Sequence, residues 1–441
     1  GPGMPGKLTR PLIQAMNTTS NQAKVPIIVR YREGVVTAQG FVAGARPKYH
    51  YGFFRGAAWD ARPEDVAALA QAPEVEKIWL DLPVHTCLDE AVRRIQVPQV
   101  WSMGLTGQGI RVAIVDTGID SNHPDFAGRI AAAVSLRGGS HRDDNGHGTH
   151  VAGIAAGSGA ASGGRYRGVA PGATLYVAKS LDAKGSGMMS DVMAGVEWAV
   201  AQRVHVICLS LGSDGPGDGT DALSETCDVA VGLGIVVCTA AGNAGPRSGS
   251  IGAPGCARRV ITVGATSSTR DTVMDFSGRG PTKDRRVKPD VCFPGENIIS
   301  CRAQGTAIGR TIDNNYVETS GTSMAVPQAV GAVALILQRM PGLSPDQVKD
   351  LLKRTAIDMG LDQNVQGSGR ADIYRAVNES NLPRPYPTDP AAPAPVTPEP
   401  PSSSTPTVPI RPVPGAAGCS RVVENNYNIP RSQESGGADG R

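Results

Sequence analysis

The sequence predicts an α/β protein with a mostly parallel central sheet covered by helices, preceded by a small α+β unit. From about residue 92 to 381, apolar strand-like runs alternate with helical stretches, which is typical of parallel sheets covered on both faces. The 441 residues are 40% hydrophobic, which is enough for a large core, so a globally disordered chain is excluded.

The small unit is predicted over residues 24–88, after an N-terminal remnant or extension at 1–23. Its helix is expected to begin at Pro63, because proline loses no hydrogen bond in a first turn and the two acidic residues that follow favour the positive end of the helix dipole. Its expected elements are the strand Val25–Tyr31, the aromatic stretch Lys48–Phe54, the helix Pro63–Ala72 and the strand Val75–Val84.

The large unit is predicted over residues 89–382. Its last helix is the best marked, because Ser344 can cap it, Pro345 fits its first position and Gln347 completes a capping box. The expected strands are Arg111–Asp116, Thr174–Lys179, His205–Ser210, Ile235–Ala240 and Val260–Val263, and the expected helices are Gly148–Ala156, Ser190–Gln202, Asp221–Leu233, Ser323–Met340 and Pro345–Thr355.

The remaining C-terminal segments are predicted to carry no core. Of the 36 residues from 383 to 418, 13 are proline, which predicts an extended, solvated linker, with a ligand segment for an SH3-like partner as the alternative. Residues 419–441 are polar and are expected to be disordered.

Charge and hydropathy exclude two classes of partner. The formal net charge is only +3, without a long run of either sign, which argues against nucleic acid as the main partner. The longest apolar stretch, Val229–Ala241, has 13 residues and contains two glycines, so it is too short to span a membrane and is interpreted as a helix end that runs into a strand.

The eight cysteines are too few for a disulfide scaffold. Cys208 and Cys238 lie in apolar runs and are expected to be buried thiols. Cys292 and Cys301, on either side of a Pro-Gly turn, are the best local candidates for a disulfide, and no Cys or His spacing predicts a zinc site.

Two segments carry a carboxylate and an imidazole suited to acyl transfer. Asp116 ends an apolar strand and places a carboxylate at the rim of a parallel sheet, although a cap or a metal ligand is the alternative. His147 lies between two glycines, an unusual setting for a core histidine, and could act as a general base. A metal site shared with His150 is the alternative, but H-E-x-x-H is absent, so His150 is interpreted as a helix-packing residue and Asp143 and Asp144 as loop residues.

Two further segments carry a hydroxyl and an amide. Ser323 opens a long apolar helix whose unpaired amides can stabilise an oxyanion, although a serine there could be only an N-cap. Pro327 is expected in the first turn of that helix, where its missing N–H costs nothing. Asn243, among small residues at a strand end, can direct its amide at a developing negative charge, or simply form a turn.

Together these segments resemble the motif blocks of the subtilisin-like serine proteases, the subtilases. D-T-G at Asp116, H-G-T-H-V-A-G at His147, A-A-G-N at Asn243 and G-T-S-M-A at Ser323 occur in the family's order, and the similarity extends over about residues 92–381. The resemblance implies a three-layer subtilisin-like fold, no cofactor for the chemistry, Ser323 as nucleophile, His147 as base, Asp116 as the residue that orients the imidazole, and Asn243 with the Ser323 N–H as oxyanion donors.

The resemblance also implies where a peptide substrate binds, as an added strand between two edges of the protein. The small, uncharged lining of the S1 pocket predicts a large apolar residue before the scissile bond. The implied substrate-binding residues are Gly185, Ser186 and Gly187 on one edge, Ser210, Leu211 and Gly212 on the other, and Ala240, Ala241 and Gly242 at the pocket.

By the same resemblance, residues 24–88 are a ferredoxin-like propeptide that inhibits the enzyme with its C-terminal strand, Val75–Val84 and the residues to Asp89, and is cut between Val84 and Asp89. The expected partners are protein and peptide substrates and the chain's own propeptide, with no nucleic acid and no membrane, and the enzyme is expected to be monomeric. A short propeptide without a visible secretion signal resembles the intracellular-type bacterial subtilases, which favours the cytoplasm and leaves secretion open.

Two positions depart from the family pattern. Gln328 stands where many relatives have His, which is expected to affect packing more than chemistry. Asp125 matches a carboxylate that binds structural calcium in secreted relatives, but the loop at residues 157–168 lacks their Asn and Asp donors, so calcium at Asp125 is an open hypothesis.

Two rival functions follow from the same residues. An α/β-hydrolase esterase would need G-x-S-x-G and the order Ser, Asp, His, whereas here Ala325 stands two residues after Ser323 and the order is Asp, His, Ser. A latent peptide-binding protein that retains its propeptide would carry the same motifs, and a test of hydrolysis separates it from an active enzyme.

Overall fold

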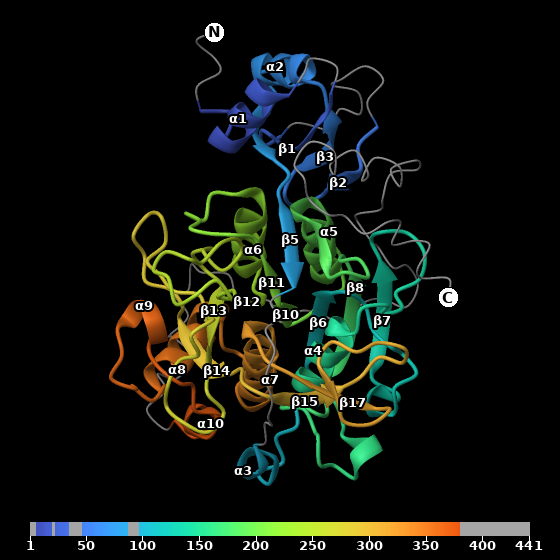
Figure 1. Ribbon diagram of the computed structural model, residues 1–441, viewed down its shortest axis with the longest axis vertical. Helices are drawn as coiled ribbons and strands as arrows, with labels where there is room; N and C mark the ends of the chain where they lie inside the picture. The colour runs from blue at the N-terminus through green and yellow to red at the C-terminus, as the bar shows by residue number, and fades with distance from the viewer. Residues whose placement is uncertain (1–5, 20–22, 35–45, 87–96, 380–441) are drawn as a thin grey trace.

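The computed structural model describes residues 6–19, 23–34, 46–86 and 97–379, which form a small unit and a larger one (Figure 1). The predicted linker at 383–418 and tail at 419–441 lie outside the described residues. Within the described part, no helix combines the length and the apolar character that a membrane crossing requires.

The small unit is a four-stranded antiparallel sheet, in the order β2-β3-β1-β4, with two helices. Helix α1 was not expected. Its Leu12 and Ala15 are buried in the core of this unit, so part of the segment predicted as an extension, 1–23, belongs to the small unit. The elements are α1 (Arg10–Thr18), β1 (Val25–Tyr31), β2 (Tyr49–Tyr51), β3 (Gly56–Ala61), α2 (Pro63–Gln71) and β4 (Val75–Leu80).

The large unit is built on a seven-stranded parallel sheet in the order β14-β13-β12-β10-β6-β8-β7. Parallel strands with both faces covered are almost wholly apolar, which is why the central strands were predicted from their apolar runs. The strands are β6 (Arg111–Asp116), β7 (Ile130–Ser135), β8 (Thr174–Lys179), β10 (Val206–Leu209), β12 (Val236–Ala240), β13 (Ile261–Thr266) and β14 (Val291–Pro294).

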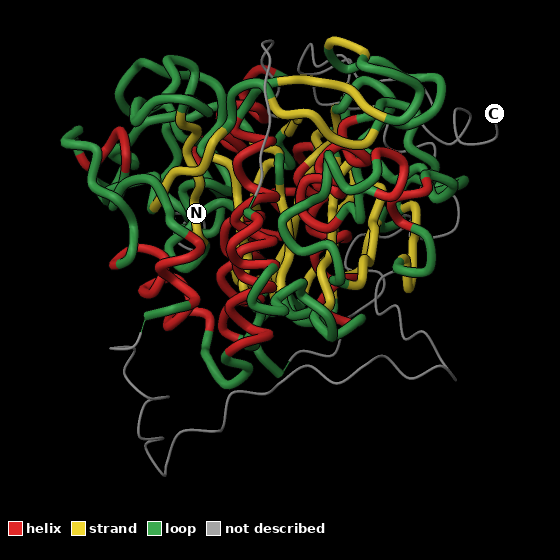
Figure 2. Tube along the Cα trace, turned by 90° about the horizontal axis from the view of Figure 1, so that it is seen from below, coloured by secondary structure: helices red, strands yellow, loops and turns green. Residues whose placement is uncertain are grey.

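Helices cover both faces of this sheet and complete a three-layer α/β fold (Figure 2). Alternate side chains of β6 enter opposite cores: Val112 and Ile114 pack with α4 and α7, whereas Ala113 and Val115 pack with α5 and α6. The helices are α3 (Pro98–Trp101), α4 (His147–Ala156), α5 (Met189–Ala201), α6 (Ala222–Gly232), α7 (Thr322–Arg339), α8 (Pro345–Arg354), α9 (Gln363–Gln366) and α10 (Ile373–Val377), with short 3-10 turns at Pro124–Phe126 and Ala160–Ser162.

The capping box predicted for the last long helix is present. The Ser344 hydroxyl accepts the Gln347 N–H at 3.2 Å, and the Gln347 side chain accepts the Ser344 N–H at 2.8 Å.

Two small antiparallel sheets complete the structure. One is β15-β17-β16, formed by Ile298–Cys301, Tyr316–Thr319 and Arg310–Thr311. The other is β11-β5-β9, in which β5 lies between two strands of the large unit. Figure 1 shows β5 as a blue arrow that descends from the small unit into the large one. The bounds of this second sheet are Leu211–Gly212 for β11, Pro83–Thr86 for β5 and Ser186–Met188 for β9.

The small unit rests on α5 and α6 through a shared apolar core and several buried polar contacts. One hydrophobic cluster contains Trp79 and Phe54 of the small unit together with residues of both helices. At its edge, Lys48 forms an ion pair with Asp191 of α5 at 2.9 Å, and Arg30 one with Glu225 of α6 at 2.6 Å. These two ion pairs tie the small unit to one position on each helix.

The structure corrects two predictions. The single strand expected at Val75–Val84 is two strands: β4 ends at Leu80 within the small unit, and β5 begins at Pro83 in the other sheet. The candidate disulfide between Cys292 and Cys301 is not formed, because both are buried free thiols on β14 and β15, which belong to different sheets. The prediction of Cys208 and Cys238 as buried thiols is confirmed.

Candidate active site

The carboxylate and the imidazole singled out in the sequence meet at the carboxyl edge of the parallel sheet. Asp116 is the last residue of β6 and His147 the first of α4, and both are fully buried. The Asp116 Oδ1 atom lies 2.6 Å from His147 Nδ1 and also accepts the Thr117 N–H at 2.8 Å. Because a carboxylate only accepts, Nδ1 carries the hydrogen and Nε2 presents its lone pair. Nε2 is buried, with no hydrogen-bond partner among the described residues.

Glycines on both sides of His147 allow this approach, as the sequence predicted. Gly146 has φ +108°, a conformation that side chains rarely adopt. A Cβ atom on Gly148 would lie 2.2 Å from the Gly118 carbonyl oxygen in the loop after β6. A larger residue at either position would therefore push α4 away from Asp116.

Ser323 is the second residue of α7 and not its N-cap, which is Gly321. Its Oγ donates to the Ser210 carbonyl at 3.0 Å, and the Ser210 Oγ donates to the Ser323 carbonyl at 3.0 Å. The expectation that Pro327 lies in the first turn is wrong, because α7 begins at Thr322. Proline has no N–H for the carbonyl four residues earlier, which is that of Ser323, and Ser210 supplies the missing donor.

Asn243 lies beside the start of α7, with its amide oriented by two hydrogen bonds. Its Oδ1 accepts the Thr322 N–H at 3.0 Å and the Thr322 hydroxyl at 2.9 Å. The Nδ2 atom is thereby turned away from Thr322, and it is buried without a partner among the described residues. An unpaired buried donor costs about 1–3 kcal/mol, and this one lies beside the start of α7.

Strand β5 occupies the position that the sequence predicted for a bound peptide. Thr86 pairs with Leu211 on one side, and Val84 pairs with Gly187 on the other. The predicted edges at 185–187 and 210–212 thus lie on either side of one extended segment, as a substrate backbone requires. Of the predicted pocket residues, Ala240 ends β12, Ala241 follows it buried in the sheet, and a Cβ on Gly242 would meet open space.

A sequence model described as the subtilase family matches residues 107–377. The chain belongs to the subtilase family. Serine protease AprX of Bacillus subtilis (strain 168) is 38% identical to it over 392 residues, which are 81% of this chain and 88% of that protein. An alkaline protease of Alkalihalobacillus alcalophilus is 39% identical over 318 residues (71% and 77%), and Subtilisin Savinase of Lederbergia lenta is 40% identical over 286 residues (65% and 97%). The subtilase is therefore a hydrolase.

Two residues near the site of this subtilase play the packing roles that the sequence predicted. Burial lowers the pKa of His150 to about 3, so the ring is neutral, and its Nε2 contacts the carbonyls of Ile298 and Val317 at 3.0 and 3.1 Å. Gln328 is buried in α7, where its amide donates to the Pro294 and Met324 carbonyls.

Sequence reasoning missed several polar residues that support the site. Asp143, interpreted as a loop residue, is buried and accepts five hydrogen bonds around His147, and Lys179 is buried with its Nζ on the Thr117 carbonyl. Asp143 and Asp144 form an acidic pair just before His147, and this pair was the sequence feature that could have indicated a supporting carboxylate. Asp143 differs from a solvated loop residue in its burial and in the hydrogen bond from Thr117, which is 26 residues away in sequence.

The residues around Asp125 do not fit a calcium ion. Asp125 Oδ1 accepts the Ala161 N–H at 2.9 Å, and Oδ2 accepts the Tyr316 hydroxyl at 2.7 Å and the Cys301 thiol at 3.5 Å. Burial raises the pKa of Tyr316 and of Cys301 above their usual ranges, so both remain protonated donors. Calcium takes six to eight oxygen ligands, whereas protein N–H, O–H and S–H groups already surround this carboxylate.

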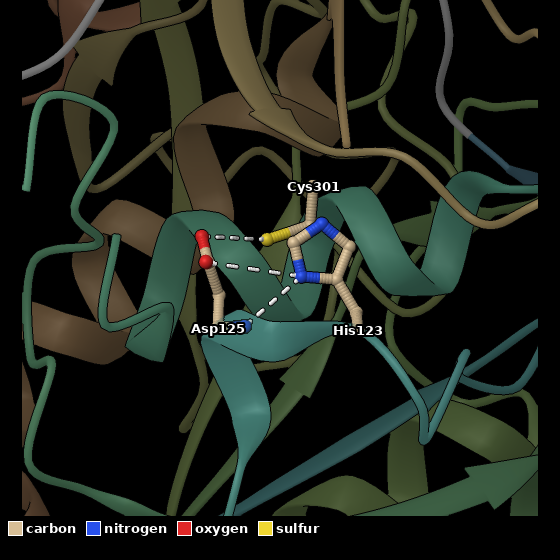
Figure 3. Close-up of side chains that lie close together, drawn as sticks. All are labelled: His123, Asp125 and Cys301. Atoms are coloured by element: carbon tan, nitrogen blue, oxygen red, sulfur yellow. Dashed lines mark hydrogen bonds and ion pairs between the residues drawn. The ribbon is translucent and has the colours of Figure 1, made fainter. Parts of the chain in front are cut away.

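The same cluster brings together His123, Asp125 and Cys301, a set of nitrogen, oxygen and sulfur atoms of the kind that zinc binds (Figure 3). However, His123 Nδ1 accepts the Asp125 N–H at 3.1 Å, and His123 Nε2 contacts the Asn315 carbonyl at 2.7 Å. Each candidate ligand thus has a partner within the protein, and we interpret the cluster as a set of hydrogen bonds that joins the turn at 124–126 to the antiparallel pair β15 and β17.

Calcium removal tests this interpretation. Dialysis against a chelator should leave the melting temperature of an inactive Ser323→Ala chain unchanged. Tyr316→Phe should destabilise the same chain by about 1–3 kcal/mol, because Asp125 Oδ2 loses a buried donor. Tyr374→Phe, at a half-exposed ring, is the matched control. The interpretation would be contradicted if chelation lowered the melting temperature and added Ca²⁺ restored it. In that case Asp125→Asn should show neither change.

Proposed function

We propose that this subtilase is a serine endopeptidase in which Ser323 is the nucleophile, His147 the general base and Asp116 the residue that orients the imidazole. The observation that carries the proposal is the buried 2.6 Å contact between Asp116 and His147, which leaves the Nε2 lone pair of the same ring available for a proton. Similarity to proteins named as serine and alkaline proteases supports the reaction class.

In the proposed first step, the Ser323 hydroxyl rotates from the Ser210 carbonyl toward His147 Nε2, gives its proton to that atom and attacks the peptide carbonyl carbon. Catalytic hydrogen bonds are often absent until substrate is bound. The oxyanion of the tetrahedral intermediate accepts hydrogen bonds from Asn243 Nδ2–H and from the Ser323 N–H. The positive end of α7 adds to its stabilisation.

The intermediate then breaks down to an acyl-enzyme. The C–N bond breaks as the imidazolium returns its proton from Nε2 to the leaving amine. Water, deprotonated by the same nitrogen, attacks the ester carbon, and collapse of the second intermediate releases the new carboxylate and restores the Ser323 hydroxyl. Asp116 remains ionised and stabilises the imidazolium throughout.

We also propose that the small unit is a propeptide, with β5 as its inhibitory strand. Its support is the pairing of β5 with both β9 and β11 and the burial of Val84 in the apolar core beneath them. Thr86 lies opposite Leu211, one residue from Ser210, which is bonded to Ser323. We therefore expect self-cleavage just after Thr86, within the predicted range that ends at Asp89; residues 87–89 lie outside the described residues.

Self-processing is tested by Ser323→Ala. The wild-type chain should split into a small fragment and a large one, whereas Ser323→Ala should remain intact, because no acyl-enzyme can form. Mass spectrometry of both chains locates the new N-terminus, and Ser344→Ala, far from the site, serves as a processing-competent control. A wild-type chain that stays intact and hydrolyses no casein favours the latent peptide-binding protein, for which the β5 strand seated in the cleft is the specific observation.

The oxyanion role is tested by Asn243→Ala. The expected result is a fall in kcat of about 10²- to 10³-fold with little change in KM, because the lost hydrogen bond strengthens only as the oxyanion forms. Steady-state kinetics with a chromogenic peptide measure both constants, and Asn378→Ala on the exposed end of α10 is the control. A rise in KM with kcat unchanged would show that Asn243 binds the ground state instead.

The S1 preference is tested with peptides that differ only in the residue before the scissile bond. We propose an apolar preference, since Ala240, Ala241 and Gly242 bring no charge to the expected pocket. Phe and Leu peptides should exceed the Lys and Glu peptides in kcat/KM by at least about tenfold, because a buried unpaired charge is costly. Fastest cleavage of the Lys or Arg peptide would refute the proposed pocket.

A further inference from the structure

We propose that Asp143 and Thr117 are positioning residues that set the contact between Asp116 and His147. Asp116 ends β6 and His147 begins α4. Because these segments are far apart in the chain, their separation must be set by tertiary contacts. The proposal rests on the roles proposed above for Asp116, His147 and Ser323. It concerns the residues that hold Asp116 and His147 in contact.

Asp143 gathers the backbone on both sides of His147. It is 1% exposed, and its Oδ1 accepts the N–H groups of Asn145 and Gly146 at 3.1 and 2.7 Å. Its Oδ2 accepts the N–H and the hydroxyl of Thr149 at 2.9 and 2.6 Å. One carboxylate therefore holds the two residues before His147 and the second residue after it, and so fixes the start of α4.

Thr117 connects this group to Asp116. Its Oγ1 donates to Asp143 Oδ1 at 2.8 Å and accepts the Gly148 N–H at 2.8 Å. Its own N–H donates to Asp116 Oδ1. A single hydroxyl thus joins the residue after Asp116 to the residue after His147.

The charge of Asp143 is required by this arrangement and is balanced nearby. Five donors point at its two oxygens, and only an ionised carboxylate accepts all of them, since an amide would turn two hydrogens toward donors. Lys179 Nζ donates to the Thr117 carbonyl at 2.8 Å and to Asp144 Oδ1 at 2.7 Å. A buried cation therefore lies beside the acidic pair Asp143 and Asp144. Both oxygens of Asp143 are thus hydrogen-bonded, and partial loss of a buried polar network is costly.

The consequence for the reaction follows from the short contact that the network maintains. A misplacement of about 1 Å in a catalytic geometry can cost about 10²-fold in rate. Neither Asp143 nor Thr117 lies among the residues that pair with β5, so loss of either should change kcat and leave KM nearly unchanged.

The test compares Thr117→Val, which keeps the side-chain shape and removes the hydroxyl, with Thr117→Ser, which keeps the hydroxyl. All chains are first processed by a trace of tagged wild-type protease, which is then removed. Thr117→Val should lower kcat about 10- to 100-fold with KM within about twofold, and Thr117→Ser should stay within about threefold of wild type. Thr355→Val, which removes a buried hydroxyl bonded to the Leu351 carbonyl in α8, controls for loss of stability alone and should leave kcat unchanged.

A double-mutant cycle distinguishes positioning from general weakening of the fold. In an Asp116→Asn chain the contact to be positioned is already impaired, so Thr117→Val should lower kcat less than about threefold there. Asp143→Asn should lower kcat by a similar factor in the wild-type chain and much less in the Asp116→Asn chain. It replaces Thr117→Val in the cycle if circular dichroism shows that Thr117→Val folds poorly.

Several outcomes would overturn the proposal. A wild-type kcat in Thr117→Val would overturn it. So would an equal fall in kcat from Thr117→Val in the wild-type and Asp116→Asn chains, or a Thr117→Ser chain whose kcat is as low as that of Thr117→Val. If Ser323→Ala or Asp116→Asn retains full activity, the proposed catalytic roles fail and this inference fails with them. If Ser323→Ala abolishes activity and Asp116→Asn lowers kcat to a small but measurable value while Thr117→Val does not reduce it, the positioning role alone is refuted.

Discussion

Parallel pairing of β6 with β10, and of β10 with β12, is the constraint on which the site depends. Because these strands run in one direction, Asp116, Ser210 and Asn243 all emerge at the same edge of the sheet. The helices α4 and α7 start at that edge and bring His147 and Ser323 to it. A one-residue slip of β6 would move Asp116 to the opposite face, so the core that fixes strand register also fixes the chemistry.

The parts of the fold that sequence predicted well are those where local signal and burial agree. β6 and β8 have the predicted bounds because each is a continuous apolar run between turn residues. β7 was missed, since it is an edge strand whose residues are mostly half-exposed and whose apolar run is largely alanine, which has a low strand propensity. The boundary between β4 and β5 was missed because Val84 is apolar for a different reason, its burial in the core of the large unit.

For the candidate site, motif residues could be predicted and their supports could not. Asp116, His147, Asn243 and Ser323 lie in short segments whose small neighbours mark them. The start of α7 was placed one residue late because Asn243, far away in sequence, accepts the Thr322 N–H that begins the helix. Interactions of this kind depend on which segments meet in space, which a periodicity of one segment does not reveal.

Pro327 has a mechanical consequence for the cleft. The Ser323 carbonyl that it leaves open accepts the Ser210 hydroxyl, and the Ser323 hydroxyl donates to the Ser210 carbonyl, so two hydrogen bonds join the start of α7 to the end of β10. Separating them would break two hydrogen bonds at once, about 1–3 kcal/mol in all. The bond from the Ser210 hydroxyl does not depend on the position of the Ser323 side chain, so it can keep the start of α7 against β10 while that side chain turns, as the proposed mechanism requires.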